Sequence, residues 1–261
     1  MVASILELKN AVLNSNEYTV LDDISISIPE GKCTVLTGHS GCGKSTLLKV
    51  LAGIIIPDSG ELFYEGKNLH MLPEKEILGF KKKSGFAFQN SALWSNKSIR
   101  ENLSLPLRFH FPELSQKVVQ EKVTSSLSFV NLLDSIDLRP AELSIGEQKL
   151  VSMMRALITE PAVIFMDDPT VSIDQEMRKK IISLIRDEKQ KGRTILIVTH
   201  DTEIISKFCD WLVFLKSGKV ITVGTLEEIK QNPSLEIRNI LASVFESASS
   251  YDRDILYLLN P

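Results

Sequence analysis

A phosphate-binding loop pattern at residues 38–46 constrains this chain more than any other feature. The pattern is G-x-x-x-x-G-K-[ST], and it is filled by Gly38, His39, Ser40, Gly41, Cys42, Gly43, Lys44, Ser45 and Thr46. In such a loop, backbone N–H groups surround phosphates, the lysine reaches the β- and γ-phosphates, and the serine hydroxyl binds Mg²⁺. An apolar run at 33–37 predicts a buried strand before the loop, and 46–52 predicts a helix whose N-terminus points at the phosphates. The chain is therefore expected to bind a nucleotide.

Composition limits the size of the core and the kinds of partner and compartment that suit this chain. With 261 residues and 43% apolar content, the chain can bury one large core, or one core plus a subdomain. A net charge of −3 gives no sign of a nucleic-acid-binding surface. The longest apolar runs, 50–56 and 211–215, are far shorter than the roughly 20 residues of a membrane-spanning helix, so a role at a membrane needs another chain. The start of the chain lacks the features of a secretory signal, and the three cysteines suit a reducing cytosol.

The segments before and after the loop predict two further subdomains. Alternating residues at 4–13 and 25–28 predict a β-hairpin with a turn at 14–16. Tyr18 lies close to this hairpin, where it either stacks on an adenine or belongs to the core. Residues 98–133 have helical spacing that Pro106 and Pro112 are expected to break, and we interpret them as a helical subdomain inserted into an α/β core.

Polar residues follow several of the predicted strands. Gln89 ends the strand 86–89, where it can reach Mg²⁺ or an attacking water, or serve as an ordinary surface amide. The run 163–169 is a buried strand that ends in Asp167, a candidate Mg²⁺ ligand, and Asp168, a candidate base for a hydrolytic water. The alternative role of an aspartate as a helix N-cap fits Asp174 better. A lone histidine is more often structural than catalytic, but the position of His200 at the tip of the strand 194–199 strengthens the catalytic interpretation.

The ordered set of motifs resembles an ABC-transporter ATPase from about Ser4 to Thr225. The set consists of the phosphate loop, the glutamine strand, the run 143–148 that opens a helix, the strand with two acids, and the histidine. The resemblance implies that Ser144 and Gly146 contact the γ-phosphate of ATP bound to a second protomer. It implies roles for the other positions as well: adenine stacking for Tyr18, phosphate and Mg²⁺ contacts for Lys44 and Ser45, sensing of membrane subunits for Gln89, linkage of the two sites for 172–174, and a switch function for His200.

The same resemblance implies the architecture. The expected fold is an α/β P-loop NTPase core of the ABC ATPase type, with an antiparallel β subdomain and an inserted helical subdomain. The ATPase domain is expected over residues 1–230, with its helical part at about 95–160, and an extension over 231–261. Within that extension, the apolar segment 251–259 is expected either to dock on a neighbouring protomer or partner, or to fold back on its own domain.

Two departures from the family pattern concern catalysis. The usual Leu-Ser-Gly-Gly-Gln signature has Ile145 in place of its first glycine and Glu147 in place of its glutamine. A carboxylate at 147 is mildly repulsive to phosphate unless it points away. Asp168 stands where the family usually has a catalytic glutamate, and it is one methylene shorter, so we expect slow rather than absent ATP hydrolysis.

The loop after Gln89 indicates the kind of transporter. The runs 88–94, 98–103 and 105–110 look like the ATPase subunit of Mla/Mce-type phospholipid transporters. This likeness implies a cytoplasmic protein held at the inner membrane by its permease, using ATP and Mg²⁺. Its partners are a second ATPase protomer, in a homodimer or alternatively a heterodimer, and a Mce-type periplasmic lipid-binding protein. The alternatives are a lipoprotein-release or amino-acid transporter, a soluble assembly ATPase, and a slowly hydrolysing nucleotide-gated structural subunit.

Overall fold

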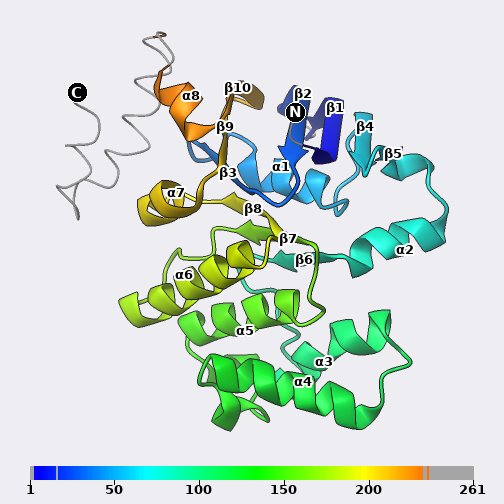
Figure 1. Ribbon diagram of the computed structural model, residues 1–261, viewed down its shortest axis with the longest axis vertical. Helices are drawn as coiled ribbons and strands as arrows, with labels where there is room; N and C mark the ends of the chain where they lie inside the picture. Colours follow the sequence, from blue (N-terminus) through cyan, green and yellow to red (C-terminus); the bar gives the residue numbers. More distant parts are fainter. Residues whose placement is uncertain (1–2, 16, 232–233, 235–261) are drawn as a thin grey trace. The chain divides into compact units, whose positions relative to one another are not determined.

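The structure is a computed structural model that describes residues 3–15, 17–231 and 234. The chain divides into two compact units, one formed by Met1–Met71 with Leu196–Pro261 and the other by Leu72–Ile195. The second point of division, between Ile195 and Leu196, falls within strand β8 (Thr194–Val198), which is labelled in Figure 1. The expectations for the segment 251–259 lie outside the described residues.

The first unit contains an antiparallel sheet. Its strands are β1 (Ser4–Asn14), β2 (Thr19–Pro29), β4 (Ser59–Tyr64) and β5 (Lys67–Asn68), in the order β2-β1-β4-β5. Leu8 pairs with Ile26 across the hairpin, and both side chains are buried because alternate residues face the core. The hairpin expected from the alternating pattern is confirmed. Tyr18 lies in its turn with 65% of its surface exposed, so the tyrosine is not a core residue.

The first unit also carries the strand that leads into the phosphate loop. Strand β3 (Cys33–Gly38) pairs in parallel with β9 (Trp211–Lys216), and helix α1 (Lys44–Leu51) follows the loop. Strand β10 (Lys219–Gly224) forms a hairpin with β9 through Ser217 and Gly218, whose φ angles of 49° and 75° suit a tight turn. A short 3-10 turn (Leu69–Met71) and helices α7 (Thr202–Phe208) and α8 (Leu226–Lys230) complete the described part of this unit.

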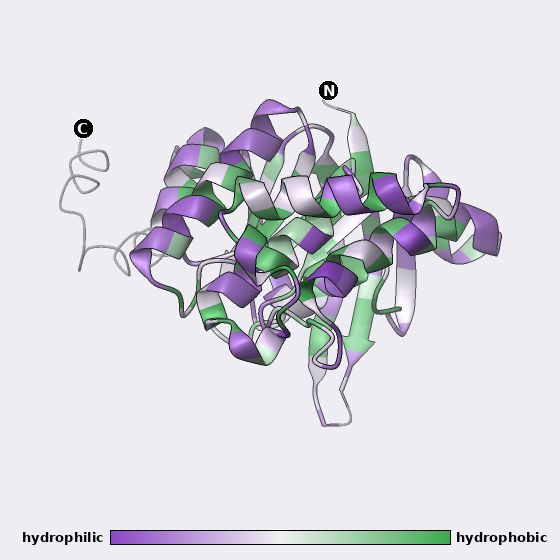
Figure 2. Ribbon diagram, turned by 90° about the horizontal axis from the view of Figure 1, so that it is seen from below, coloured by the Kyte–Doolittle hydropathy of each residue, from purple (hydrophilic) through white to green (hydrophobic). Residues whose placement is uncertain are grey.

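The second unit contains two parallel strands with helices around them. Strand β6 (Ser84–Ala87) pairs with β7 (Val163–Asp167), and all residues of β7 are buried. Helix α2 (Glu74–Lys82) precedes β6, and helix α6 (Gln175–Gln190) follows β7. Asp174 caps α6 by accepting a 2.9 Å hydrogen bond from the Met177 N–H, as the sequence predicted. Figure 2 shows hydrophilic and hydrophobic residues alternating along the helices, which is typical of helices with one buried face.

The helical part of the second unit consists of α3 (Ile99–His110), α4 (Gln116–Phe129) and α5 (Ile145–Leu157), which pack against one another, with 3-10 turns at Leu133–Ser135 and Pro140–Glu142. The expectation that Pro106 breaks this segment is wrong, because α3 continues through it. A proline removes only one helical hydrogen bond, and α3 is secured by a capping box at Ser98 and by the buried Leu103 and Leu107. Pro112 does lie in the break between α3 and α4.

Candidate functional site

The phosphate loop forms a cradle between β3 and α1. Gly43, the N-cap of α1, has a φ of 100°, and a Cβ built on it lies 2.8 Å from the carbonyl oxygen of Val20. Only glycine fits this position without strain, because it combines positive φ with a close backbone contact. No side chain in the described part of the chain caps α1, so its first N–H groups face the loop. The contact with Val20 also places the strand that follows Tyr18 beside the loop.

Lys44 ties the two ends of this cradle together. Its Nζ donates hydrogen bonds of 2.8 Å to the carbonyl oxygens of Gly38 and His39, and the side chain is only 7% exposed. The ammonium is therefore positioned inside the loop. Ser45, the next residue, lies in the first turn of α1 and is partly exposed.

His200 belongs to the same electrostatic environment as the loop. It is exposed and follows Thr199, whose N–H bonds the carbonyl of Leu36 in β3 at 3.4 Å. Partial desolvation lowers the pKa of His200, and the positive charges of Lys44 and His39 lower it further. These effects favour the neutral form of the imidazole.

We expect ATP binding to raise the pKa of His200. The triphosphate brings negative charge next to Lys44, and this charge offsets the cationic field that disfavours the imidazolium. An NMR titration of the histidine ring protons with and without ATP measures the change. His70, exposed on the 3-10 turn, provides the control resonance that ATP should not affect. A fall in the His200 pKa on adding ATP contradicts this assignment.

In the second unit, the expected acidic residues end strand β7. Asp167 is 2% exposed, and Asp168 has a φ of 43°, a left-handed conformation that turns the chain sharply after the strand. Strand β6 ends at Ala87, opposite Met166, so the exposed Gln89 follows at the same edge of the strand pair as the two acids. The roles of Gln89, Asp167 and Asp168 stay predictions.

The signature segment forms a capping box at the start of α5. The Glu147 carboxylate accepts 2.8 Å hydrogen bonds from the backbone N–H and from the hydroxyl of Ser144. The carboxylate therefore points toward the helix start, where the sequence predicts a phosphate contact. A Cβ built on Gly146 lies 2.6 Å from Cγ of Met177, so the start of α5 packs directly against the start of α6. Ile145 is 62% exposed beside them.

Sequence reasoning missed two cations of α5 that contact the loops after β6 and β7. Lys149 is buried and donates to the carbonyls of Asp168 at 3.1 Å and Val171 at 2.6 Å. Burial lowers the pKa of this lysine, while the charges of Asp168 and Asp167 act in the opposite direction. Arg155 donates to the carbonyls of Ala92 and Ser91, both at 2.9 Å. One sequence signal could have identified Lys149: it is a charged residue on the apolar face of an amphipathic helix, on the same face as the buried Met153.

The donors expected for Mg²⁺ suit that ion chemically. Among the described residues, no group of three or more His, Cys, Asp and Glu side chains forms a metal-binding cluster. Mg²⁺ does not require such a cluster, because one or two protein oxygens, phosphate oxygens and waters complete its shell. The hydroxyl of Ser45 and the carboxylate of Asp167 are oxygen ligands of this kind. Within the described residues, no helix is both long and apolar enough to cross a bilayer.

The strand, the loop with its buried lysine, and the uncapped helix define a P-loop nucleotide-binding protein. A comparison with protein families identifies the narrower class: the model described as ABC transporter matches residues 21–171. The chain belongs to this family and is an ATP-hydrolysing cassette of a transporter.

Curated relatives and solved structures agree with this assignment. The methionine import ATP-binding protein MetN of Wolinella succinogenes is 37% identical over 224 residues, which cover 85% of this chain and 73% of the relative. MetN of Mannheimia succiniciproducens is 32% identical over 233 residues, which cover 88% of this chain and 67% of the relative. A dimeric, post-hydrolysis structure of the ATP-binding cassette MJ0796 bound to ADP and Pi has a TM-score of 0.77 and 28% identity, covering 85% of this chain and 98% of that one. The expected fold class is confirmed, including its antiparallel β and helical subdomains.

Proposed function

We propose that this chain is the ATPase subunit that drives a separate membrane permease for a solute of the amino-acid class, and that it works as a homodimer closed over two ATP molecules. The similarity to MetN proteins, which are named for methionine import, favours this solute class over phospholipid. The dimeric state of the MJ0796 cassette supports pairing of two copies. In a homodimer, both composite sites contain Asp168 and the altered signature.

Each candidate residue has a role in this proposal. Lys44 and the N-terminus of α1 bind and orient the phosphates. Ser45 and Asp167 would each offer an oxygen ligand to Mg²⁺, which would neutralise charge on the phosphate oxygens. Asp168 accepts a proton from the attacking water, and its short side chain slows this step. Tyr18, exposed in its turn, offers a flat surface to the adenine.

A groove in the second unit is the observation that supports coupling to a permease. It has a volume of 320 Å³, and its lining includes Phe86, Phe88, Trp94, Pro106, His110 and Arg155. Partial burial lowers the pKa of His110, and the positive charges of Lys82 and Lys81 lower it further. These two lysines make the surroundings of the histidine, which lines the groove, positive. The groove is lined in part by Phe88, the residue before Gln89. A partner segment with apolar and acidic residues matches its chemistry.

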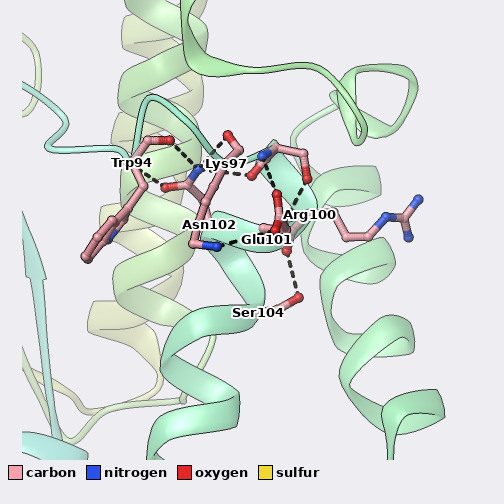
Figure 3. A network of polar contacts seen from close by, with 7 residues as sticks. Trp94, Lys97, Arg100, Glu101, Asn102 and Ser104 are labelled. Atoms are coloured by element: carbon pink, nitrogen blue, oxygen red, sulfur yellow. Dashed lines mark hydrogen bonds and ion pairs between the residues drawn. The ribbon is translucent and has the colours of Figure 1, made fainter.

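Hydrogen bonds tie the rim of this groove to helix α3. Figure 3 shows the fully buried Asn102 of α3 bound to the loop that carries Trp94. Asn102 accepts a 2.8 Å bond from the Trp94 N–H and donates to the carbonyls of Trp94, Lys97 and Ser98 at 3.0–3.2 Å. The Trp94 side chain is nevertheless 57% exposed. A fixed backbone with an exposed aromatic side chain is typical of a preorganised docking site.

Purification of the tagged full-length chain from its native cells in mild detergent tests the proposal. We expect a polytopic permease to co-purify, and we expect methionine or a related amino acid to stimulate ATP hydrolysis by the complex in vesicles. Trp94→Ala should lower permease recovery at least about tenfold. An aromatic side chain that becomes buried when an interface forms contributes about 2 kcal/mol or more to binding. Phe129→Ala, which removes an aromatic ring that is 61% exposed elsewhere on the same unit, is the matched control. Recovery of soluble partners alone contradicts the proposal.

Phospholipid transport is the second candidate. The runs that resemble Mla/Mce-type ATPases contain Ala92, Trp94, Pro106 and His110, and all four line the groove. The residues that resemble phospholipid-transporter ATPases therefore lie on the surface proposed to meet the permease. Differences between transporter classes are expected on that surface. Co-purification of a Mce-type lipid-binding protein, with stimulation by phospholipid and none by amino acids, supports this candidate over the first.

A further inference from the structure

Helix α5 contacts both functional loops of the second unit through cationic side chains. The Lys149 ammonium bonds two carbonyls of the loop 168–171, which carries the expected catalytic acid. The Arg155 guanidinium bonds two carbonyls of the loop 91–92, at the wall of the groove. The two cations lie about 9 Å apart along the helix axis. A single helix therefore holds the groove loop at one point and the catalytic loop at another.

Both loops contain residues in left-handed backbone conformations. Ser91, Ala92 and Asp168 all have positive φ angles, of 63°, 46° and 43°. Left-handed backbone costs non-glycine residues about 1–2 kcal/mol each, and it persists only where the surroundings impose it. The carbonyls that Lys149 and Arg155 bind belong to these residues or to their close neighbours. The cations are thus placed to impose these conformations.

Helix α5 is suited to act as a stiff connection. Buried residues occupy most of its length, including Leu150, Val151 and Met153, and at its start Gly146 allows direct contact with Met177 of α6. A close-packed helix moves as one body, because its core contacts resist internal deformation. Such a helix is suited to carry a shift of the groove loop to the loop 168–171.

We propose that α5 is a rigid link between the partner-facing groove and the catalytic loop, with Lys149 and Arg155 as the positioning residues at its two contacts. This inference rests on the proposed function, because it requires a chain that hydrolyses ATP. It goes further by identifying the element through which occupancy of the groove changes the geometry around Asp168.

A double-mutant cycle on ATP hydrolysis by the full-length chain tests the link. Lys149→Met and Arg155→Met each keep much of the apolar stem and remove the donors. We expect each to lower kcat about tenfold with little change in the KM for ATP, because misplacement of a catalytic group by 1 Å costs up to about a hundredfold. We expect the double variant to lose about tenfold as well, since breaking either contact already disconnects the loops. A product of the single effects, about a hundredfold, overturns the link.

Two controls keep the outcome interpretable. Lys122→Met removes a partly exposed lysine that pairs with Glu160 at 2.7 Å, and combined with Arg155→Met it should give additive effects. Lys149→Gln and Arg155→Lys keep a hydrogen-bond donor and should recover part of kcat, and their cycle replaces the first one if a methionine variant does not fold. Wild type without any ATP hydrolysis contradicts the proposed function itself. If wild type hydrolyses ATP and the effects of the two methionine substitutions on kcat multiply, the link is contradicted and the proposed function is not.

Discussion

Lys44→Met is expected to weaken ATP binding about a hundredfold and to lower the hydrolysis rate by between about a hundredfold and a thousandfold. The ammonium is held at 2.8 Å from the carbonyls of Gly38 and His39, so it is already oriented toward the phosphate position. Hydrogen bonds to charged groups contribute about 1.5–3 kcal/mol each, and methionine provides a stem of similar length without a donor. Isothermal titration with ATP and a steady-state hydrolysis assay measure the two effects.

Lys49→Met is the matched control for this experiment. Lys49 lies in the last turn of the same helix and is partly exposed, so its loss removes a charge from α1 without touching the cradle. Near-wild-type affinity is expected for it. Equal losses in the two variants contradict a specific phosphate role for Lys44 and indicate a general effect of charge.

Local patterns predicted much of the fold and the positions of the candidate residues. The strand before Gly38 and the helix after it follow from an apolar run and from glycine spacing, both of which act within a few residues. The cap at Asp174 is local in the same sense. Such features are determined by neighbours in the chain, so they can be identified before any tertiary contact is known.

Features that depend on tertiary contacts could not be predicted in the same way. Pro106 stays inside α3 because buried leucines and a capping box outweigh one lost hydrogen bond. The partners of Lys149 and Arg155 are carbonyls far along the sequence, and no residue pattern indicates such backbone acceptors. The direction of the Glu147 carboxylate likewise depended on whether a capping box formed. The catalytic and metal-binding roles themselves stay predictions.

Asp168→Glu is expected to raise the rate of ATP hydrolysis at least about tenfold. General-base catalysis contributes about 10²- to 10⁴-fold and requires hydrogen-bond reach, and the added methylene extends the carboxylate toward the water. The backbone conformation at Asp168 implies that this substitution also lowers the stability of the fold. The φ of 43° at Asp168 is tolerated better by aspartate than by glutamate, so we expect a loss of stability of about 1 kcal/mol.

Steady-state hydrolysis and thermal unfolding of the same preparations separate these two effects. Asp134→Glu is the control: it lengthens an exposed acid on the 3-10 turn Leu133–Ser135 of the second unit, where no change in the hydrolysis rate is expected. An Asp168→Glu rate equal to or below that of wild type contradicts the idea that side-chain length limits turnover. In that case the altered signature, with the Ser144 hydroxyl bonded to Glu147, becomes the feature that limits hydrolysis in both composite sites of a homodimer.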